Sequence, residues 1–101
     1  MEKKILVIIK DPGQKPRVEP AFENTLENMQ KTVGGYIETV TLATDLIFIC
    51  DEEGRLKDYE HNCSICGVDF VGTVIAVGSK GENFASLKAK NVPQVLRMME
   101  G

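Results

Sequence analysis

The chain has 101 residues and a formal net charge of −3, with 43% hydrophobic and 27% charged residues. These values are typical of one small globular domain with a modest core, and they exclude an intrinsically disordered chain. We therefore treat residues 1–101 as a single domain. No cluster of Lys and Arg provides a face that neutralises phosphates, so we expect no binding to nucleic acid.

The N-terminus contains no segment typical of export or membrane insertion. Its basic residues are followed by only five consecutive apolar residues, Ile5 to Ile9, which is too short for a signal peptide or a membrane span. We therefore expect a cytoplasmic protein that does not enter a membrane. The three cysteines are expected to stay reduced there, as free thiols.

The first predicted strand lies within Lys3–Lys10. Its apolar run shows no polar alternation, which indicates burial on both faces and a central place in the sheet. A Pro-Gly turn at 11–13 leads into Gln14–Pro20, where two prolines restrict any strand to a short or edge position. This loop is long enough to form the lip of a ligand site, although an ordinary surface connection is the simpler interpretation.

One amphipathic helix is expected before Gly34-Gly35, which would end it in a left-handed C-cap. Asn24 with Glu27 fits a capping box, although an earlier start after Pro20 is also compatible. The apolar stripe of this helix consists of Phe22, Leu26, Met29 and Val33. Such a stripe is typical of core packing.

The middle of the chain predicts an antiparallel hairpin of Tyr36–Leu42 and Leu46–Cys50, followed by a turn at 51–54. Arg55–Cys66 is polar and irregular. A further strand is expected at Asp69–Val77, with a bulge or close backbone approach at Gly72.

The C-terminal part predicts a loop at Gly78–Gly81 and a final helix over about Pro93–Met99, capped by Asn91. Its inward residues would be Val92, Leu96 and Met99. Together these elements predict an α+β fold: a small, mostly antiparallel four-stranded sheet with one main helix on one face and a short C-terminal helix. Free sheet edges favour pairing with a second copy, so we expect a homo-oligomer.

Several short sequence motifs, here called words, occur in a familiar order over Ile5–Leu87. They are PG then KP, NTLENMQKTVGGYIETV, IFICDEEGRL, HN, DFVGTVIAVG and SL. This order resembles a small family described as a domain of unknown function, in which the VGGYIE word at Val33–Glu38 is fairly specific. Members occur in phages and in Firmicutes mobile elements, some beside ArdA-type antirestriction domains. The resemblance implies a small α+β domain in a mobile-element setting and no established activity. The positions on its words are Gly13, Gly34, Gly35, Tyr36, Glu52, Gly54, Asn62, Gly72 and Gly78.

The chain departs from that pattern at Asp51, where Asn is expected, and in the thiols that follow Asn62. A zinc set of Cys50, His61, Cys63 and Cys66 offers the four N and S donors that tetrahedral zinc needs. No second CxxC or HxxxH pair supports it, and Cys50 ends an apolar strand where buried structural thiols are common. A thioredoxin-like role is disfavoured because the CxxC does not open a helix after a strand.

No catalytic signature is present, so we expect no enzyme and no cofactor. His61 is the only histidine, and no GxSxG word occurs. The loop at 78–81 is not a P-loop, although its backbone and Lys80 could hold an anion.

The leading hypothesis is a non-enzymatic small-molecule-binding or inhibitory accessory protein of phage or mobile-element origin. It would sequester a nucleotide-like signal in a pocket at a subunit interface. Tyr36 would stack on a base, Asn62 would hydrogen-bond the base or ribose, Lys80 would hold phosphate, and Arg17 is a weaker anion candidate. The alternatives are a protein-binding module that inhibits a host enzyme, through an exposed edge or the acidic turn at 51–53, and a thiol-metal zinc domain.

Overall fold

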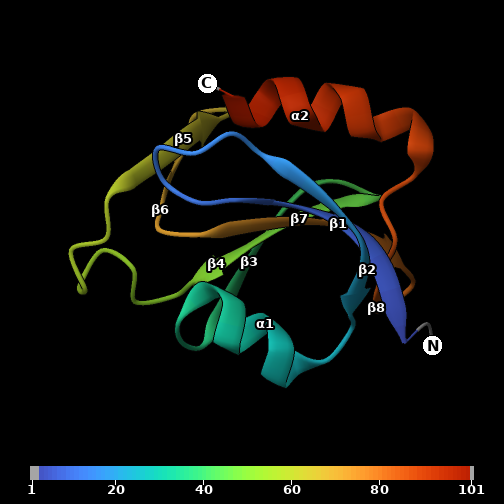
Figure 1. Cartoon of the computed structure of the whole chain (residues 1–101), viewed down its shortest axis with the longest axis horizontal. Coiled ribbons are helices and arrows are strands. Elements are labelled where there is room, and N and C mark those ends of the chain that lie inside the picture. The colour runs from blue at the N-terminus through green and yellow to red at the C-terminus, as the bar shows by residue number, and fades with distance from the viewer. Residues whose placement is uncertain (1–2, 101) are drawn as a thin grey trace.

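An antiparallel sheet with a covering layer on each face forms the core of this computed structural model, which describes residues 3–100 (Figure 1). The strands are β1 (Lys4–Lys10), β2 (Arg17–Glu23), β3 (Ile37–Ala43), β4 (Leu46–Asp51), β5 (His61–Ile65), β6 (Val68–Val71), β7 (Val74–Lys80) and β8 (Asn83–Ala85). The helical elements are α1 (Leu26–Val33), the 3₁₀ turn η1 (Ala89–Asn91) and α2 (Val92–Glu100).

The main sheet has the strand order β2-β1-β7-β4-β3, with β8 paired to β7, and every pairing is antiparallel. The predicted α+β class with an antiparallel sheet is confirmed, as are the interior position of β1 and the β3–β4 hairpin. The sheet has six strands rather than the four we predicted. β2 is an edge strand, as the prolines indicated, and β5 and β6 form a separate two-stranded sheet.

Each face of the sheet carries its own hydrophobic core. Met29 and Val33 of α1 pack on one face, against side chains of β1, β4 and β7. On the other face, Val95 and Met99 of α2 pack together with Cys63, Ile65 and Phe70 of the β5–β6 hairpin. The helices therefore cover opposite faces. α2 has nine residues and α1 has eight, so the description of one main helix and one short helix is wrong. No helix within residues 3–100 has the length and apolar character needed to cross a membrane.

The start of α1 differs from the prediction. Phe22 lies in β2, where it pairs with Ile5, and strand pairing continues to Glu23. Thr25, not Asn24, is the N-cap, and its side chain accepts a hydrogen bond from the backbone N–H of Asn28 at 3.1 Å. Pairing of β2 with β1 supplies the backbone hydrogen bonds around Phe22 and stabilises a strand there. The spacing of Phe22 from the apolar residues of α1, which also fits a helix, is coincidental. The C-cap is confirmed, with Gly34 at φ 99°.

Gly72 separates two strands that the sequence suggested were one. β6 ends at Val71 in the small sheet and β7 begins at Val74 in the main sheet. Gly72 has φ 72°, and its N–H donates to the carbonyl of Glu60 at 2.9 Å. A residue with a left-handed backbone turns the chain sharply. At Gly72 the chain therefore passes from one sheet to the other, where we had predicted a bulge or close backbone approach within one strand.

Two further predictions are corrected. The segment expected to be irregular contains β5, which joins β6 through Cys66 and Gly67, both with positive φ, as a two-residue hairpin turn requires. The loop expected at 78–81 is mostly strand, because β7 continues to Lys80 and pairs with β8. The C-terminal helix is confirmed, although Val95, which is fully buried, was missing from its predicted inward face.

Replacement of Gly72 by Ala tests the close approach at this change of sheet. A Cβ there would lie 2.5 Å from Cδ2 of Tyr59 and would also be strained by the positive φ. We expect the free energy of unfolding to fall by about 3 kcal/mol. Gly67→Ala is the matched control, since Gly67 has φ 81° but no atom near its Cβ position, and should cost ~1 kcal/mol. Equal losses in urea unfolding would contradict the proposed role of Tyr59.

Candidate functional site

Three hollows gather at one end of the main sheet, where β1 and β4 end and β7 begins. The largest, here called the basic cavity, has a volume of about 610 Å³, and its lining includes Lys10, Gln14, Lys15, His61, Asn62 and Glu100. The Tyr59 cleft, about 420 Å³, is lined by Pro12, Val33, Tyr59, Glu60, Gly72 and Thr73. The β3 groove, about 330 Å³, is lined by residues that include Glu38, Val40, Cys50, Arg55, Val68 and Phe70.

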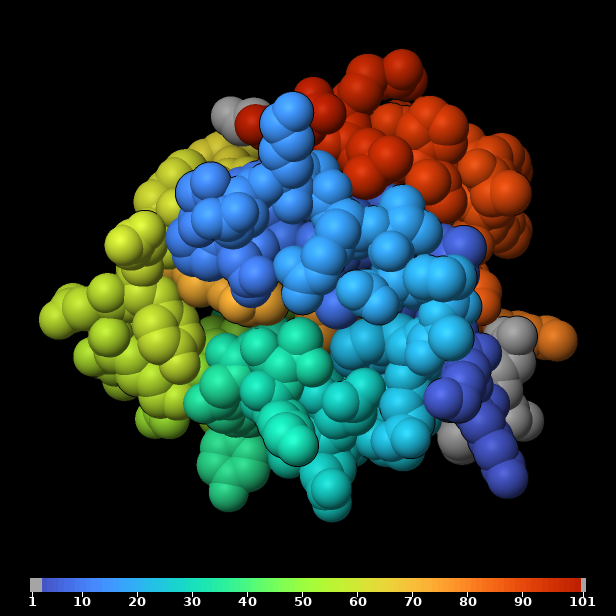
Figure 2. Space-filling view, viewed as in Figure 1, coloured from blue at the N-terminus to red at the C-terminus, as the bar shows by residue number. Residues whose placement is uncertain are grey.

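The Tyr59 cleft is visible on the face shown in Figure 2. It lies between the blue β1–β2 turn, the green end of α1 and the yellow-green loop before β5, with orange atoms of the β6–β7 junction at its base. Pro12 lines this cleft and Gly13 lines the basic cavity, so the β1–β2 turn separates the two hollows.

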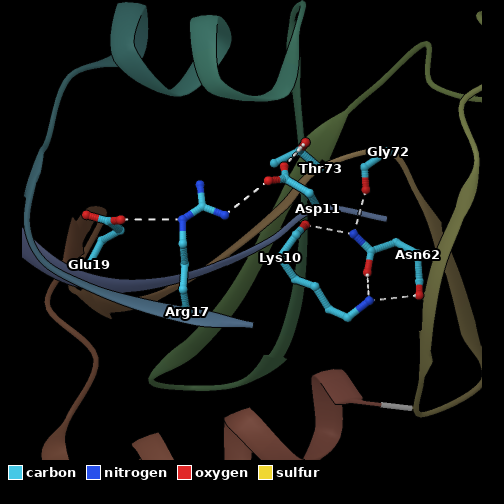
Figure 3. A network of polar contacts seen from close by, with 7 residues as sticks. All are labelled: Lys10, Asp11, Arg17, Glu19, Asn62, Gly72 and Thr73. Atoms are coloured by element: carbon cyan, nitrogen blue, oxygen red, sulfur yellow. Dashed lines mark hydrogen bonds and ion pairs between the residues drawn. The ribbon is translucent and has the colours of Figure 1, made fainter. Parts of the chain in front are cut away.

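Asn62 joins three segments beneath the basic cavity (Figure 3). Its side-chain amide donates to the carbonyl of Lys10 at 2.8 Å and to the carbonyl of Gly72 at 2.7 Å. Its two oxygens, Oδ1 and the backbone carbonyl, accept from Lys10 Nζ at 2.9 and 3.2 Å. The side chain thereby fixes the hairpin to the end of β1 and to the start of β7.

Lys10 is a buried cation that forms no direct ion pair within residues 3–100. Its residue is 6% exposed, and its ammonium is hydrogen-bonded only to the two neutral oxygens of Asn62. No Asp or Glu side chain of residues 3–100 forms an ion pair with it. Burial of an unpaired charge costs free energy, and two acceptors leave one N–H of the ammonium without a partner within this part of the chain.

The neighbouring Asp11 carboxylate is turned away from Lys10 and holds the β1–β2 loop instead (Figure 3). Its Oδ1 accepts from Thr73 Oγ1 at 2.7 Å and its Oδ2 from Arg17 Nη1 at 3.0 Å. Arg17 also lies 3.4 Å from Glu19 through Nε. The hydrogen bond from Thr73 holds the pKa of Asp11 below its ordinary value although partial burial raises it, and Arg17 and the charge of Lys10 lower it further.

Asp51 forms a second buried polar centre, here called the Asp51 clasp with Lys57 and Tyr59. Its Oδ2 accepts from Lys57 Nζ at 2.8 Å and from Tyr59 Oη at 3.1 Å, and its Oδ1 accepts from the backbone N–H of Glu53 at 2.9 Å. Burial by itself raises the pKa of Asp51. The hydrogen bonds from Lys57, Glu53 and Tyr59 and the charge of Lys57 outweigh it, so the pKa lies below the ordinary 3.8.

The glycines of the family words make room for this clasp. A Cβ at Gly35 would lie 2.7 Å from Lys57 Nζ and 2.9 Å from Asp51 Oδ2. One at Gly34 would lie 2.7 Å from Tyr59 Oη, and one at Gly54 would lie 3.0 Å from Val71 Cγ2 and 3.3 Å from Tyr59 Cδ2. Lys57 Nζ also donates to the carbonyl of Gly34 at 3.1 Å, at the C-terminal end of α1. The double glycine thus ends a helix and leaves room for a partly buried ion pair.

The four predicted ligand residues do not share one cavity. Asn62 lines the basic cavity, and Arg17 binds Asp11 at the nearby turn. Tyr36 is 68% exposed, and its carbonyl accepts from the N–H of Glu52 at 2.9 Å. Lys80 lies at the far end of β7, where it pairs with Asn83, whereas the end of β7 near the cavity pairs with Lys10. Asn62 therefore contacts one end of the main sheet, and Lys80 lies at the other end.

The candidate zinc residues are not brought together. Cys50 and Cys63 are buried in the core, while Cys66 is exposed in the β5–β6 turn. Within residues 3–100, no group of three or more His, Cys, Asp or Glu side chains has a metal-binding arrangement. Burial, with smaller effects from Glu38 and Asp51, raises the pKa of Cys50 to about 11, and burial also raises that of Cys63. Both thiols are thus poor sources of thiolate at neutral pH.

The sequence analysis missed Lys10, Lys57 and Tyr59, whereas Lys15 lies in the Gln14–Pro20 loop that it named as a possible lip of a ligand site. Lys10 reads as the ordinary charged end of an apolar strand, and Tyr59 as an isolated aromatic residue in a polar segment. The one available signal was the turn directly after Lys10, because chain reversals after buried strands often border sites.

The Asp51 clasp gives a pH-dependent stability. Because folding lowers the pKa of Asp51, its contribution is fully present above the ordinary value of 3.8 and is lost as pH falls through the lower folded value. Asp51→Asn should lower the free energy of unfolding at neutral pH by about 1–3 kcal/mol. Asp51→Asn should also make the free energy of unfolding depend less steeply on pH below pH 3.8. The pH dependence that remains is expected from Asp11 and Asp45, whose pKa values are also lowered. An unchanged slope in urea titrations would contradict this assignment.

Thiol labelling should separate the three cysteines. Cys66 is exposed and should react rapidly with a thiol reagent in the native protein, whereas Cys50 and Cys63 should react only after unfolding, because both are buried and hold raised pKa values. Mass spectrometry after a short pulse should therefore show one label, and Cys66→Ser should show none. A second rapid label would contradict the burial of Cys50 or Cys63, and peptide mapping of the label would show which.

Similarity of this chain to other proteins is found at the level of a protein family. No curated protein and no solved structure matches it. A family model matches residues 3–100, which is nearly the full length and includes both buried polar centres. The chain therefore belongs to the family described as a domain of unknown function (DUF3846).

Proposed function

We propose that the protein is a non-enzymatic small-molecule-binding domain that holds an anionic, nucleotide-like ligand in the basic cavity. The observation that carries this proposal is the buried ammonium of Lys10, which lies at the wall of the largest of the three hollows and forms no direct ion pair within residues 3–100. A bound anion would supply an ion-pair partner and a further acceptor.

The other residues of the cavity suit a ligand with two kinds of group. Lys15 and Gln14, on the β1–β2 loop, add a second cation and an amide to the Lys10 wall. Glu100 lies at the C-terminal end of α2, where the helix dipole is negative, so this wall repels an anion. We place the anionic group at Lys10 and Lys15, and hydroxyl or amino groups of the ligand at Glu100. A sugar phosphate or nucleotide has both.

The biological setting is also a proposal. The resemblance to proteins of phages and Firmicutes mobile elements, some beside ArdA-type antirestriction domains, supports an accessory role in anti-defence. A cavity of about 610 Å³ is of the size that encloses small molecules. A cytoplasmic protein of this kind would act by sequestering a nucleotide-like signal, and it would need no catalytic residue.

Binding of nucleotides to Lys10→Met tests the proposal. The wild-type protein should bind members of a panel of mono-, tri- and cyclic nucleotides, with an affinity that falls as salt rises. Lys10→Met keeps the aliphatic stem but removes the charge, so it should weaken binding about tenfold or more. Lys15→Ala should weaken it less, because Lys15 is exposed and its loss leaves the Asn62 hydrogen bonds intact. Calorimetry and native mass spectrometry measure both effects.

Lys80→Ala is the matched control and also tests the role that the sequence suggested for Lys80. It removes the same charge at the opposite end of the sheet, so binding should be unchanged. A loss with Lys80→Ala equal to that with Lys10→Met would mean that the basic cavity is not the site. Failure of the wild-type protein to bind any nucleotide of the panel would contradict the proposal that its ligand is nucleotide-like.

A protein-binding module that inhibits a host enzyme is the second candidate. Leu56 is 83% exposed and Tyr36 is 68% exposed, and acidic Glu52 and Glu53 lie in the same region. Exposed aromatic and aliphatic side chains with charged neighbours are common at protein interfaces. A stoichiometric host protein that is captured by the wild type but not by Leu56→Lys would favour this function over ligand sequestration.

A further inference from the structure

The side chain of Asn62 has little hydrogen-bonding capacity left for a ligand. Both N–H groups of its amide are used, one by the carbonyl of Lys10 at 2.8 Å and the other by the carbonyl of Gly72 at 2.7 Å. Its Oδ1 accepts from Lys10 Nζ at 2.9 Å, which leaves that oxygen one further lone pair. The residue is also buried. A base or a ribose would therefore find neither donor of this amide free.

The ammonium of Lys10 is held by two oxygens of the same residue (Figure 3). Nζ lies 2.9 Å from Oδ1 of Asn62 and 3.2 Å from its backbone carbonyl. Without the side chain only the longer bond would remain, and a lysine ammonium sits on a flexible stem that moves when its acceptors are lost. Both acceptors are neutral, so they orient the ammonium without cancelling its charge. Lys10 lines the basic cavity, where its third N–H is available to a ligand.

We infer that Asn62 is a positioning residue, which directs the Lys10 ammonium at an anionic oxygen of the ligand and does not contact the ligand itself. The inference rests on the proposed function of the basic cavity. It assigns Asn62 to recognition of the phosphate and not of the base or ribose. An aspartate at this position would pair with the ammonium and would place an oxygen against the two carbonyls to which the amide donates. The amide therefore suits a site whose positive charge is reserved for a ligand.

A double-mutant cycle for nucleotide affinity tests whether Asn62 acts through Lys10. Asn62→Ala alone should weaken binding about fivefold, because the ammonium loses the shorter of its two bonds. In the Lys10→Met background there is no ammonium to position, so Asn62→Ala should change the affinity by less than about twofold. In the Lys15→Ala background it should again cost about fivefold, because Lys15 is not bound to Asn62. Calorimetry measures each affinity, and circular dichroism checks that each variant is folded.

Inorganic phosphate separates recognition of the phosphate from recognition of the rest of a nucleotide. A misplaced ammonium should weaken the binding of inorganic phosphate and of nucleotides by the same factor. Loss of a direct contact with the base or ribose would weaken the binding of nucleotides alone. We expect Asn62→Ala to give the same factor for both ligands.

Asn91→Ala is the matched control. Its amide donates to Asp45 Oδ2 at 3.3 Å, outside the basic cavity, so affinity should be unchanged. If Asn62→Ala does not fold, Asn62→Ser takes its place in the same cycle, because its hydroxyl can still donate to one of the two carbonyls.

The outcomes separate this inference from the proposed function. Equal losses from the Asn62 variant with and without Lys10, or a loss confined to nucleotides, would show direct contact and overturn the inference while the proposed function stands. An Asn62 variant that binds as tightly as the wild type also overturns it, because Asn62 would then serve the fold alone. A wild type that binds neither nucleotides nor inorganic phosphate overturns the proposed function and this inference with it.

Discussion

Burial of β1 on both faces is the constraint from which the rest of the structure follows. Alternate side chains of its apolar run enter opposite cores, Val7 on the α1 side and Ile8 on the α2 side. One helix cannot cover both, so α1 occupies one face while α2 and the β5–β6 hairpin occupy the other. The next residue after this run is Lys10, which is carried into the interior by the strand that precedes it. Asn62 then becomes necessary, because it supplies acceptors to that ammonium and ties the hairpin to the sheet.

The parts of the fold that could be predicted are those fixed by local pattern. The apolar run of β1, the alternation of β3 and the glycine after Val33 each determine their own segment. Phe22 was misassigned because its spacing fits a helix and a strand equally, and only pairing with β1 decides between them. Gly72 was misjudged for a similar reason. A glycine in a strand pattern marks a change in backbone direction, but its neighbours in sequence do not reveal that two sheets meet there.

The candidate site was predicted less completely than the fold because it depends on long-range contacts. Asn62, which we proposed as a ligand contact, lines a hollow, yet its partners are Lys10 and Gly72, which lie 52 and 10 positions away in the chain. Lys80 was selected from its glycine-flanked loop, although that segment is largely strand and lies at the other end of the sheet. Polarity and flexibility can be read from a sequence, but the end of the sheet at which a segment lies cannot.

The two buried polar centres differ in a way that separates structural from functional roles. Asp51 has a cation in Lys57 and further donors in Tyr59 and the backbone of Glu53, so its charge is balanced within the chain. Close packing in this region accounts for four glycines of the family words: Gly34, Gly35, Gly54 and Gly72. Their presence therefore needs no catalytic or ligand-binding role.

Lys10 is similarly buried but forms no direct ion pair within residues 3–100, and the Asp11 carboxylate interacts with its charge only at longer range. This arrangement supports the proposal that an anion from outside the chain binds there. By that reasoning the residues of the VGGYIE word pack the scaffold, whereas the end of β1 and the HN word at residues 61–62 line the site that we propose.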